Sequence, residues 1–220
     1  MTDRETETTL AGPGPAPQDG KLDLKRRYRP LYTAKARATL VEVPPLSYLM
    51  IDGHGDPNLV PEYAEAVQAL FAVAYAAKFA VRRGGGQDFT VMPLQGLWWV
   101  PDMADFDVED KSAWDWTLLV LQPETVTAEV LDRARETASA KAAAAAVRRI
   151  RLDSLHEGPA AQVLHTGPYA AEGPTIRGLH EFIAGQGQRP TGKHHEIYLG
   201  DPRRTAPQKL RTIIRQPVTP

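Results

Sequence analysis

Residues 193–202 read Lys193-His194-His195-Glu196-Ile197-Tyr198-Leu199-Gly200-Asp201-Pro202, and this stretch carries the most informative residue of the chain, Glu196. The part 194–199 is typical of a β-strand because glycines bound it on both sides. Side chains alternate along a strand, so Glu196 shares a face with His194 and Tyr198, while Ile197 and Leu199 face the core. If the Glu196 face lines a cavity, desolvation raises the proton affinity of the acid. An ordinary solvated strand face is an equal alternative.

The order of predicted elements along the chain repeats. A strand, a helix and two strands are expected in each half, at about 46–52, 61–81, 88–100 and 112–121, and again at 161–165, 174–184, 194–199 and 210–218. The first strand of each half ends in a turn with glycine and proline, Gly53 to Pro57 and Gly167-Pro168. The sequence therefore predicts an α+β fold of tandem β-α-β-β repeats, related by a pseudo-two-fold axis around a central ligand cleft.

The composition is that of a soluble globular protein. The chain has 220 residues, 42% of them hydrophobic, with a formal net charge of −1. Residues 1–20 are expected to be a disordered tail, followed by a single domain over 21–220 with repeats at about 40–121 and 158–218 and a connector helix at about 125–150. No signal peptide and no run long enough to span a membrane are apparent, so a cytoplasmic location without nucleic-acid or membrane partners is the default expectation.

Tryptophan is concentrated in one part of the chain. Only 7% of residues are aromatic, yet all four tryptophans lie in a short segment, as Trp98, Trp99, Trp114 and Trp116. Core packing and a cage for a flat aromatic ligand are both compatible with this clustering, and at least one indole is expected in each role. Because adjacent strand residues point to opposite faces, only one of Trp98 and Trp99 should face the cleft.

Neither a metal nor a cofactor is expected. The histidines, including His54, His165, His194 and His195, fall on separate predicted elements without the spacing of a zinc motif, and the chain has no cysteine. The glycines at 84–86 lack the following Lys-Ser/Thr of a phosphate-binding loop.

Three separated stretches resemble the signatures of a known family. They are Leu49-Met50-Ile51-Asp52-Gly53-His54-Gly55-Asp56-Pro57-Asn58, Pro93-Leu94-Gln95-Gly96-Leu97-Trp98-Trp99 and the stretch from His194 to Arg203. In this order they are similar to the GyrI-like small-molecule-binding family, in particular its cyclopropanoid cyclopropyl hydrolase clade, and the resemblance extends from Leu22 to Pro217. It implies a GyrI-like (SOUL-like) pair of β-α-β-β units around a pocket, with a buried glutamate at the position of Glu196.

The resemblance also implies an activity. Members of the clade are cofactor-free hydrolases that open the cyclopropane ring of DNA-alkylating polyaromatic natural products of the yatakemycin and duocarmycin type, and so protect cells. On this basis Glu196 is the candidate base for the attacking water, and Tyr198 and His54 are the first candidates for a donor to the dienone oxygen. The expected substrate-binding residues are Trp98, Trp99, Trp114, Trp116, Phe89, Tyr169 and His194.

Two other functions stay open at this stage. A central glutamate among aromatic rings also suits a protein that sequesters planar aromatic or cationic drugs without turnover. A protein-interaction module is the third possibility. The expected partner is a small polyaromatic genotoxin, and the sequence leaves the oligomeric state open.

Overall fold

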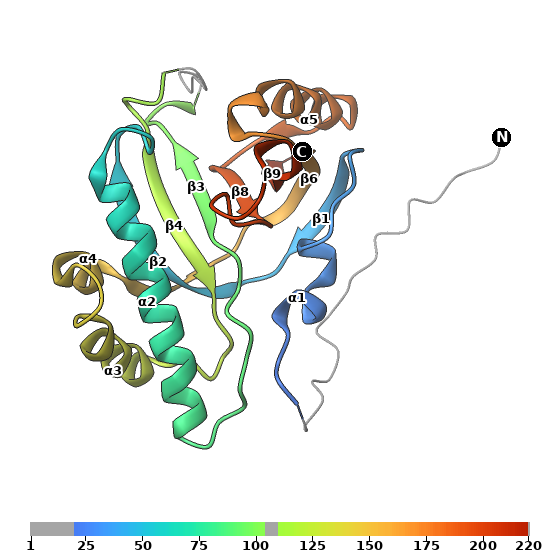
Figure 1. The fold of residues 1–220 in the computed structure, drawn as a ribbon. Coiled ribbons are helices and arrows are strands. Elements are labelled where there is room, and N and C mark those ends of the chain that lie inside the picture. The colour runs from blue at the N-terminus through green and yellow to red at the C-terminus, as the bar shows by residue number, and fades with distance from the viewer. Residues whose placement is uncertain (1–19, 104–109, 220) are drawn as a thin grey trace.

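The computed structural model describes residues 20–103 and 110–219 (Figure 1). The expected N-terminal tail of residues 1–20 lies outside the described residues except for Gly20. The helices are α1 (Leu24–Arg27), α2 (Pro61–Arg83), α3 (Ala128–Ala138), α4 (Ala144–Arg149) and α5 (Gly173–Gly185). The strands are β1 (Thr39–Val43), β2 (Leu46–His54), β3 (Gln95–Trp99), β4 (Asp115–Leu121), β5 (Arg151–Leu155), β6 (Gly158–Thr166), β7 (Arg189–Pro190), β8 (His194–Tyr198) and β9 (Arg211–Thr219).

The strands form one antiparallel sheet in which the predicted duplication is visible. The order across the sheet is β1-β6-β9-β8-β3-β4-β2-β5, with the short β7 paired to β9. One repeat is β2-α2-β3-β4 and the other is β6-α5-β8-β9, and they meet where β3 pairs with β8. The strand that precedes each repeat crosses to the other one, since β1 pairs with β6 and β5 pairs with β2. The predicted α+β fold of two β-α-β-β repeats is confirmed.

The register of the central strand pair locates the pseudo-two-fold axis. Gly96 of β3 lies opposite Glu196 of β8, and Trp98 lies opposite His194. On the other side of this pair, the backbone N–H of Tyr198 donates to the carbonyl of Leu94 at 3.0 Å. We therefore place the axis between Gly96 and Glu196, so that these two residues hold equivalent positions. A single carboxylate stands at the axis because its counterpart is glycine.

Helices α2 and α5 cover the same face of the sheet, the face that carries Glu196. On α2, Tyr63 stacks against Trp98, the register neighbour of His194. On α5, Leu179 and Ile183 join a core cluster with strand residues on that face. Glu196 consequently lies on the helix-covered side, between the two repeats.

Helix α2 forms as its sequence predicts. Pro61 occupies the first turn, where its missing N–H costs nothing, and the predicted inner stripe is buried: Ala66, Leu70, Val73, Ala77 and Val81. At 23 residues, with a window of mean hydropathy 1.3, α2 is long and apolar enough to cross a membrane, contrary to the expectation that no run is. Half of that window is buried inside the protein, as in a core helix.

The connector differs from the single helix expected at about 125–150. Helix α3 is capped by Thr127, whose hydroxyl accepts from the N–H of Val130, and it ends at Ala138 with Ser139 as its C-cap. The chain then turns before α4 begins. Alanine-rich composition favours a continuous helix, but α3 packs on α2 whereas α4 contacts both α2 and β2. A straight helix could not make both sets of contacts.

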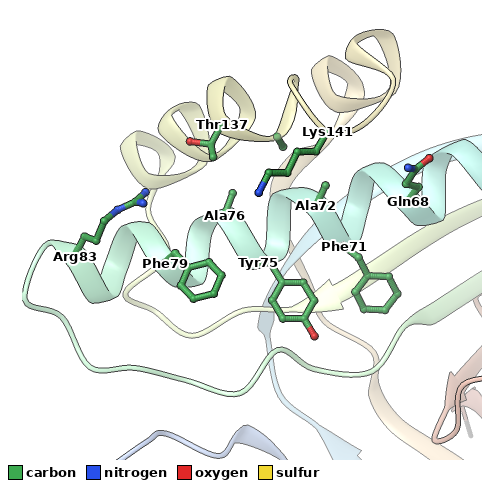
Figure 2. A pocket seen from close by; sticks show the side chains of 10 residues that line it. Gln68, Phe71, Ala72, Tyr75, Ala76, Phe79, Arg83, Thr137 and Lys141 are labelled. Carbon is green, nitrogen blue, oxygen red and sulfur yellow. The ribbon is translucent and has the colours of Figure 1, made fainter.

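The outer side of α2 carries a groove of about 410 Å³ between this helix and the α3 segment. Figure 2 shows Phe71, Tyr75 and Phe79 along α2, with Thr137 and Lys141 on the opposite wall. Tyr75 is 50% exposed and Phe79 45%. None of the residues that line the groove is a carboxylate, so it lacks the acid on which the sequence-based hypothesis depends.

Candidate active site

Glu196 is buried and held by two hydrogen-bonding groups from its own strand. The residue is 8% exposed. His194 Nε2 lies 3.1 Å from Glu196 Oε1, and the Tyr198 hydroxyl donates to Oε2 at 2.7 Å. Burial acts to raise the pKa of Glu196, but the hydrogen bonds of His194 and Tyr198 and the charge of His194 outweigh it, so the pKa is lowered. The predicted shared face of these three residues is confirmed, and Glu196 is ionised near neutral pH.

A second carboxyl, Glu172, lies beside Glu196. It precedes the first residue of α5 and is buried. Burial, followed by the negative charge of Glu196, raises the pKa of Glu172 to about 9, and a hydrogen bond between the two carboxyls contributes in the same direction. The site thus pairs a neutral carboxyl with an ionised one, which is the condition for separate acid and base roles.

The sequence reasoning missed Glu172, although a signal was present. The residue stands between the turn at Gly167-Pro168 and the helix start at Gly173-Pro174. A strand-to-helix junction of this kind occurs in each repeat, so an acid at this point is a signal for a second carboxyl at the site. Repeat one contributes Tyr63 from the first turn of α2, which was also missed.

His165 of β6 fixes the turn that leads to Glu172. Its Nε2 lies 3.3 Å from the carbonyl oxygen of Pro168, and its Nδ1 lies 2.9 Å from Thr175 Oγ1. A carbonyl only accepts, so Nε2 carries the proton and Nδ1 accepts from the threonine hydroxyl. One imidazole thereby ties the turn to the first part of α5, and Tyr169 and Glu172 lie between these two anchor points.

The first repeat supplies an aromatic wall. Trp98 stacks with Tyr63 at a centroid distance of 6.1 Å, and Trp114 lies 5.5 Å from Trp98. Burial, followed by the negative charge of Glu196, raises the pKa of Tyr63 well above its usual value. The phenol of Tyr63 is therefore neutral and close to the carboxyl pair.

Tyr169 extends the aromatic surface on the second repeat. Its ring meets that of Tyr198 edge-on at 5.4 Å. Burial, followed by the charges of Glu172 and Glu196, raises the pKa of Tyr169 to about 12. The structure thus brings together five of the predicted residues, Glu196, Tyr198, His194, Tyr169 and Trp98, with Trp114 next to Trp98.

The remaining tryptophans lie elsewhere. Trp116 is fully buried, and a Cβ atom at Gly53 would lie only 2.0 Å from its ring, so the indole occupies the space that this glycine leaves. Its Nε1 donates to the carbonyl of Gly55 at 3.3 Å. Trp99 points to the opposite face from Trp98, where Lys193 Nζ lies 3.1 Å from the ring centroid. We assign Trp116 to the core and Trp99 to the other face.

Two predicted site residues are placed away from Glu196. His54 is exposed and bonds to Asp115 at 2.9 Å, and because Gly53 faces Trp116, strand alternation puts His54 on the face opposite Glu196. Phe89 is buried beside Lys78, on α2. Lys78 follows Tyr63 by 15 residues, a rise of about 22 Å along the helix. We therefore assign neither His54 nor Phe89 to the site.

A buried polar network supports β8 from behind. His195 Nδ1 lies 2.9 Å from Glu157 Oε1, and Arg215 Nη1 donates to Glu157 Oε2 at 3.1 Å. Burial alone would raise the pKa of Glu157, but the charges and hydrogen bonds of His195 and Arg215 lower it to about 2. Arg215 also donates to the backbone carbonyl of Leu31, so the network ties the N-terminal segment to the sheet behind Glu196.

Comparison with known proteins agrees with this architecture. The family model of the GyrI-like small-molecule-binding domain matches residues 38–219. The chain belongs to the GyrI-like family. Among the described residues, no group of three or more His, Asp or Glu side chains is arranged to hold a metal ion.

Similar solved structures extend the comparison. An uncharacterised conserved protein from Listeria innocua is 41% identical, with a TM-score of 0.83, over 90% of this chain and 100% of its own. A protein described as a hydrolase, encoded by lin2189 of Listeria innocua, is 37% identical with a TM-score of 0.80 over the same shares. The C-terminal domain of EcmrR, at 13% identity and a TM-score of 0.52, shares only the fold. No curated protein matches the chain.

Proposed function

We propose that this GyrI-like protein is a cofactor-free hydrolase that opens the cyclopropane ring of polyaromatic DNA-alkylating compounds. The observation that carries the proposal is the pair of an ionised Glu196 and a neutral Glu172 next to an aromatic wall. The relatives from Listeria innocua described as hydrolases, at 37% identity over 90% of the chain, support a hydrolytic reaction. The sequence resemblance to the cyclopropyl hydrolase clade supports the substrate.

The two repeats divide the work in this proposal. The first repeat offers the aromatic wall of Tyr63, Trp98 and Trp114, which forms the apolar side of the site. The second repeat offers the polar groups, from Glu172, Glu196 and Tyr198. A planar molecule with one reactive end fits an arrangement that is apolar on one side and charged on the other.

The reaction needs one base and one water molecule. The Glu196 carboxylate accepts a proton from water while the water oxygen bonds to the ring methylene. The cyclopropane C–C bond breaks, and its electron pair moves through the dienone to the oxygen, which becomes a phenolate. The phenolate takes a proton from solvent, and Glu196 returns its proton to solvent. The product is the substrate plus one water.

The neighbours of Glu196 prepare it for this role. Glu172, as the neutral member of the pair, keeps the total charge of the two carboxyls at −1 and bonds to Glu196. Tyr198 donates its proton to Glu196 Oε2, so its hydroxyl hydrogen is already engaged and orients the base. Tyr198 is therefore a positioning residue in this proposal, instead of the donor to the dienone that the sequence suggested.

Mass spectrometry of a duocarmycin-type compound incubated with the protein tests the proposal. The expected result is a product heavier by one water, formed by the parental protein and not by Glu196→Gln. Glu181→Gln, an exposed acid on α5, is the matched control and should react at the parental rate. Unchanged compound after incubation with folded parental protein would rule out the hydrolase.

A binding protein without turnover is the second candidate, and one observation favours it. The negative charge of Glu196 lies among Tyr63, Tyr169 and Trp98, an environment that attracts hydrophobic cations. In this case, planar cations would quench tryptophan fluorescence saturably and be recovered unchanged. Glu196→Gln would then weaken cation binding and leave neutral aromatic ligands unaffected.

A further inference from the structure

The ring of Trp98 is enclosed by other rings. The residue is 3% exposed. Tyr63 stacks on it with an interplanar angle of 27°, and Trp114 packs against it at 56°. A ligand cannot stack on Trp98 while both neighbours stay in place, so the cage role predicted from the sequence does not describe this residue fully.

The indole N–H of Trp98 is nevertheless unused. Among the residues that the structure describes, Nε1 is buried without a hydrogen-bond partner. The contrast is Trp116, whose Nε1 donates to the carbonyl of Gly55. Buried indole donors normally find a partner, because an unpaired polar group in the interior is unfavourable. A buried donor without a partner in the protein fits a hydrogen-bond acceptor on a bound ligand.

The location of this donor is set by Gly96. A Cβ atom at Gly96 would lie 2.8 Å from Trp98 Nε1, so the N–H sits directly over the glycine. Gly96 is the register partner of Glu196. The free donor of repeat one therefore lies over the strand position opposite the base of repeat two, and the missing side chain at Gly96 leaves it room.

We propose that Trp98 Nε1 is a hydrogen-bond-donating subsite for a conjugated carbonyl oxygen on a planar aromatic ligand. The inference rests on the proposed function, because ring opening turns that carbonyl into a phenolate and needs a donor for it. In a spiro-cyclopropyl dienone the methylene and the oxygen lie at opposite ends of one ring. The carboxyl pair at the methylene cannot also reach the oxygen, and His54 lies on the other face.

The indole acts by hydrogen bonding and not by proton transfer. Its N–H donates but does not ionise near neutral pH, so it stabilises the developing phenolate as an oxyanion donor does. Tyr63 and Trp114 cover Trp98 in the unliganded protein, and Tyr63 is only half-buried. Entry of the ligand therefore displaces Tyr63 and puts the flat ligand in its place against the indole.

The test is the substitution Trp98→Phe, which removes the N–H and keeps a ring. Trp99→Phe is the matched control, since it makes the same change in the next residue, whose ring lies on the other face of the sheet. Binding is measured with 9-fluorenone and with fluorene, which differ by the carbonyl alone. The expected result is about tenfold weaker fluorenone binding for Trp98→Phe, with fluorene unchanged and both ligands unchanged for Trp99→Phe. Equal losses for both ligands, or no saturable fluorenone binding by the parental protein, would overturn the subsite.

Turnover separates this inference from the proposed function. With a duocarmycin-type substrate, Trp98→Phe should lower kcat about a hundredfold and raise KM about tenfold, as it weakens fluorenone binding. If the parental protein and Trp98→Phe hydrate the substrate at the same rate, the subsite is refuted and the proposed hydrolase function stands. If Trp98→Phe does not fold, the ¹⁵N–¹H indole resonance of Trp98 in the parental protein decides. A downfield shift on fluorenone saturation supports the subsite, and an unmoved resonance refutes it.

Discussion

At the level of single residues, the carboxyl pair lowers the stability of the folded protein. Glu172 is buried next to Glu196, and its raised pKa means that the folded protein holds a proton which the unfolded chain would release. Such strain is common at functional sites, where an arrangement suited to chemistry replaces one suited to folding. The pair therefore predicts opposite effects of one substitution on stability and on activity.

Replacing Glu172 by glutamine should stabilise the protein at alkaline pH. The folded pKa of Glu172 is about 9, above its ordinary value of 4.5, so its stability contribution falls as pH rises from about 4.5 to about 9. Glutamine does not titrate. Glu172→Gln should gain on the order of 5 kcal/mol over the parental protein at pH 8 and nothing at pH 4. Urea denaturation at both pH values measures the difference, and a variant less stable at pH 8 would contradict the pairing.

Replacing Glu196 by glutamine should abolish turnover and keep the fold. The two side chains have nearly the same volume, but the amide cannot accept the proton of water, so kcat should fall about 10²- to 10⁴-fold. The rate of the parental protein should decline at acidic pH, below the lowered pKa of Glu196, because the base is protonated there. It should decline again above about pH 9, where Glu172 ionises. Circular dichroism and initial rates test both points. Parental rates in Glu196→Gln would show that another group is the base.

At the scale of elements, the strands of repeat one are packed around their indoles. Trp116 of β4 fills the space over Gly53 of β2, and Trp98 of β3 fills the space over Gly96. In each case a glycine makes room for a ring that must lie flat on the sheet under α2. These contacts, more than strand propensity, fix where the aromatic wall stands.

Adding one methyl group to the sheet should test this packing. Gly53→Ala puts a Cβ atom into the ring of Trp116, and overpacking of this kind costs about 1–3 kcal/mol. Gly178→Ala on α5 is the control, because a Cβ there meets nothing within 4 Å and favours the helix by about 0.5–1 kcal/mol. Thermal melts compare the two. Similar melting temperatures would mean that Trp116 can move aside without loss.

The tryptophans should separate into classes when each is changed to alanine. Trp116→Ala should lose about 3–5 kcal/mol, because the fully buried indole leaves a cavity. Trp99→Ala should keep its turnover, since the ring faces Lys193 on the side away from Glu196. Melts paired with rate measurements on the two variants decide. If Trp99→Ala folds but no longer turns over substrate, the site lies on the face of Trp99 and not on that of Glu196.

At the scale of the whole molecule, the network behind Glu196 joins segments far apart in the chain. Arg215 of β9 binds Glu157 and also the carbonyl of Leu31, and His195 binds Glu157 from β8. Acid should break this link. The depressed pKa of Glu157, about 2 against an ordinary 4.5, provides stability that is fully present above about pH 4.5 and is lost as pH falls toward 2.

The variant Glu157→Gln should show the size of that contribution. It should be less stable than the parental protein by on the order of 3 kcal/mol at pH 7, and the difference should vanish near pH 2. Part of the loss reflects Arg215, which stays buried without its partner. Denaturation at several pH values measures the gap. A gap that does not change with pH would mean that the charge of Glu157 is not what stabilises the fold.

Local sequence patterns predicted the repeat, the helix α2 and the face of Glu196. Each depends on a local period: alternation puts His194, Glu196 and Tyr198 on one side, and helical spacing buries Leu70 and Val73. The sequence patterns did not predict the short edge strands β1 and β5 or the break between α3 and α4. These features depend on tertiary contacts with the other repeat or with α2.

The partners of Glu196 depend on how distant segments of the chain pack together. Glu172 and Tyr63 are remote from Glu196 in sequence and reach it because α2 and α5 cover one face of the sheet. The same packing put His54 on the far face and Phe89 at the far end of α2. A strand pattern assigns a side chain to a face, but which other groups share its surroundings, and so its pKa, depends on how distant segments meet.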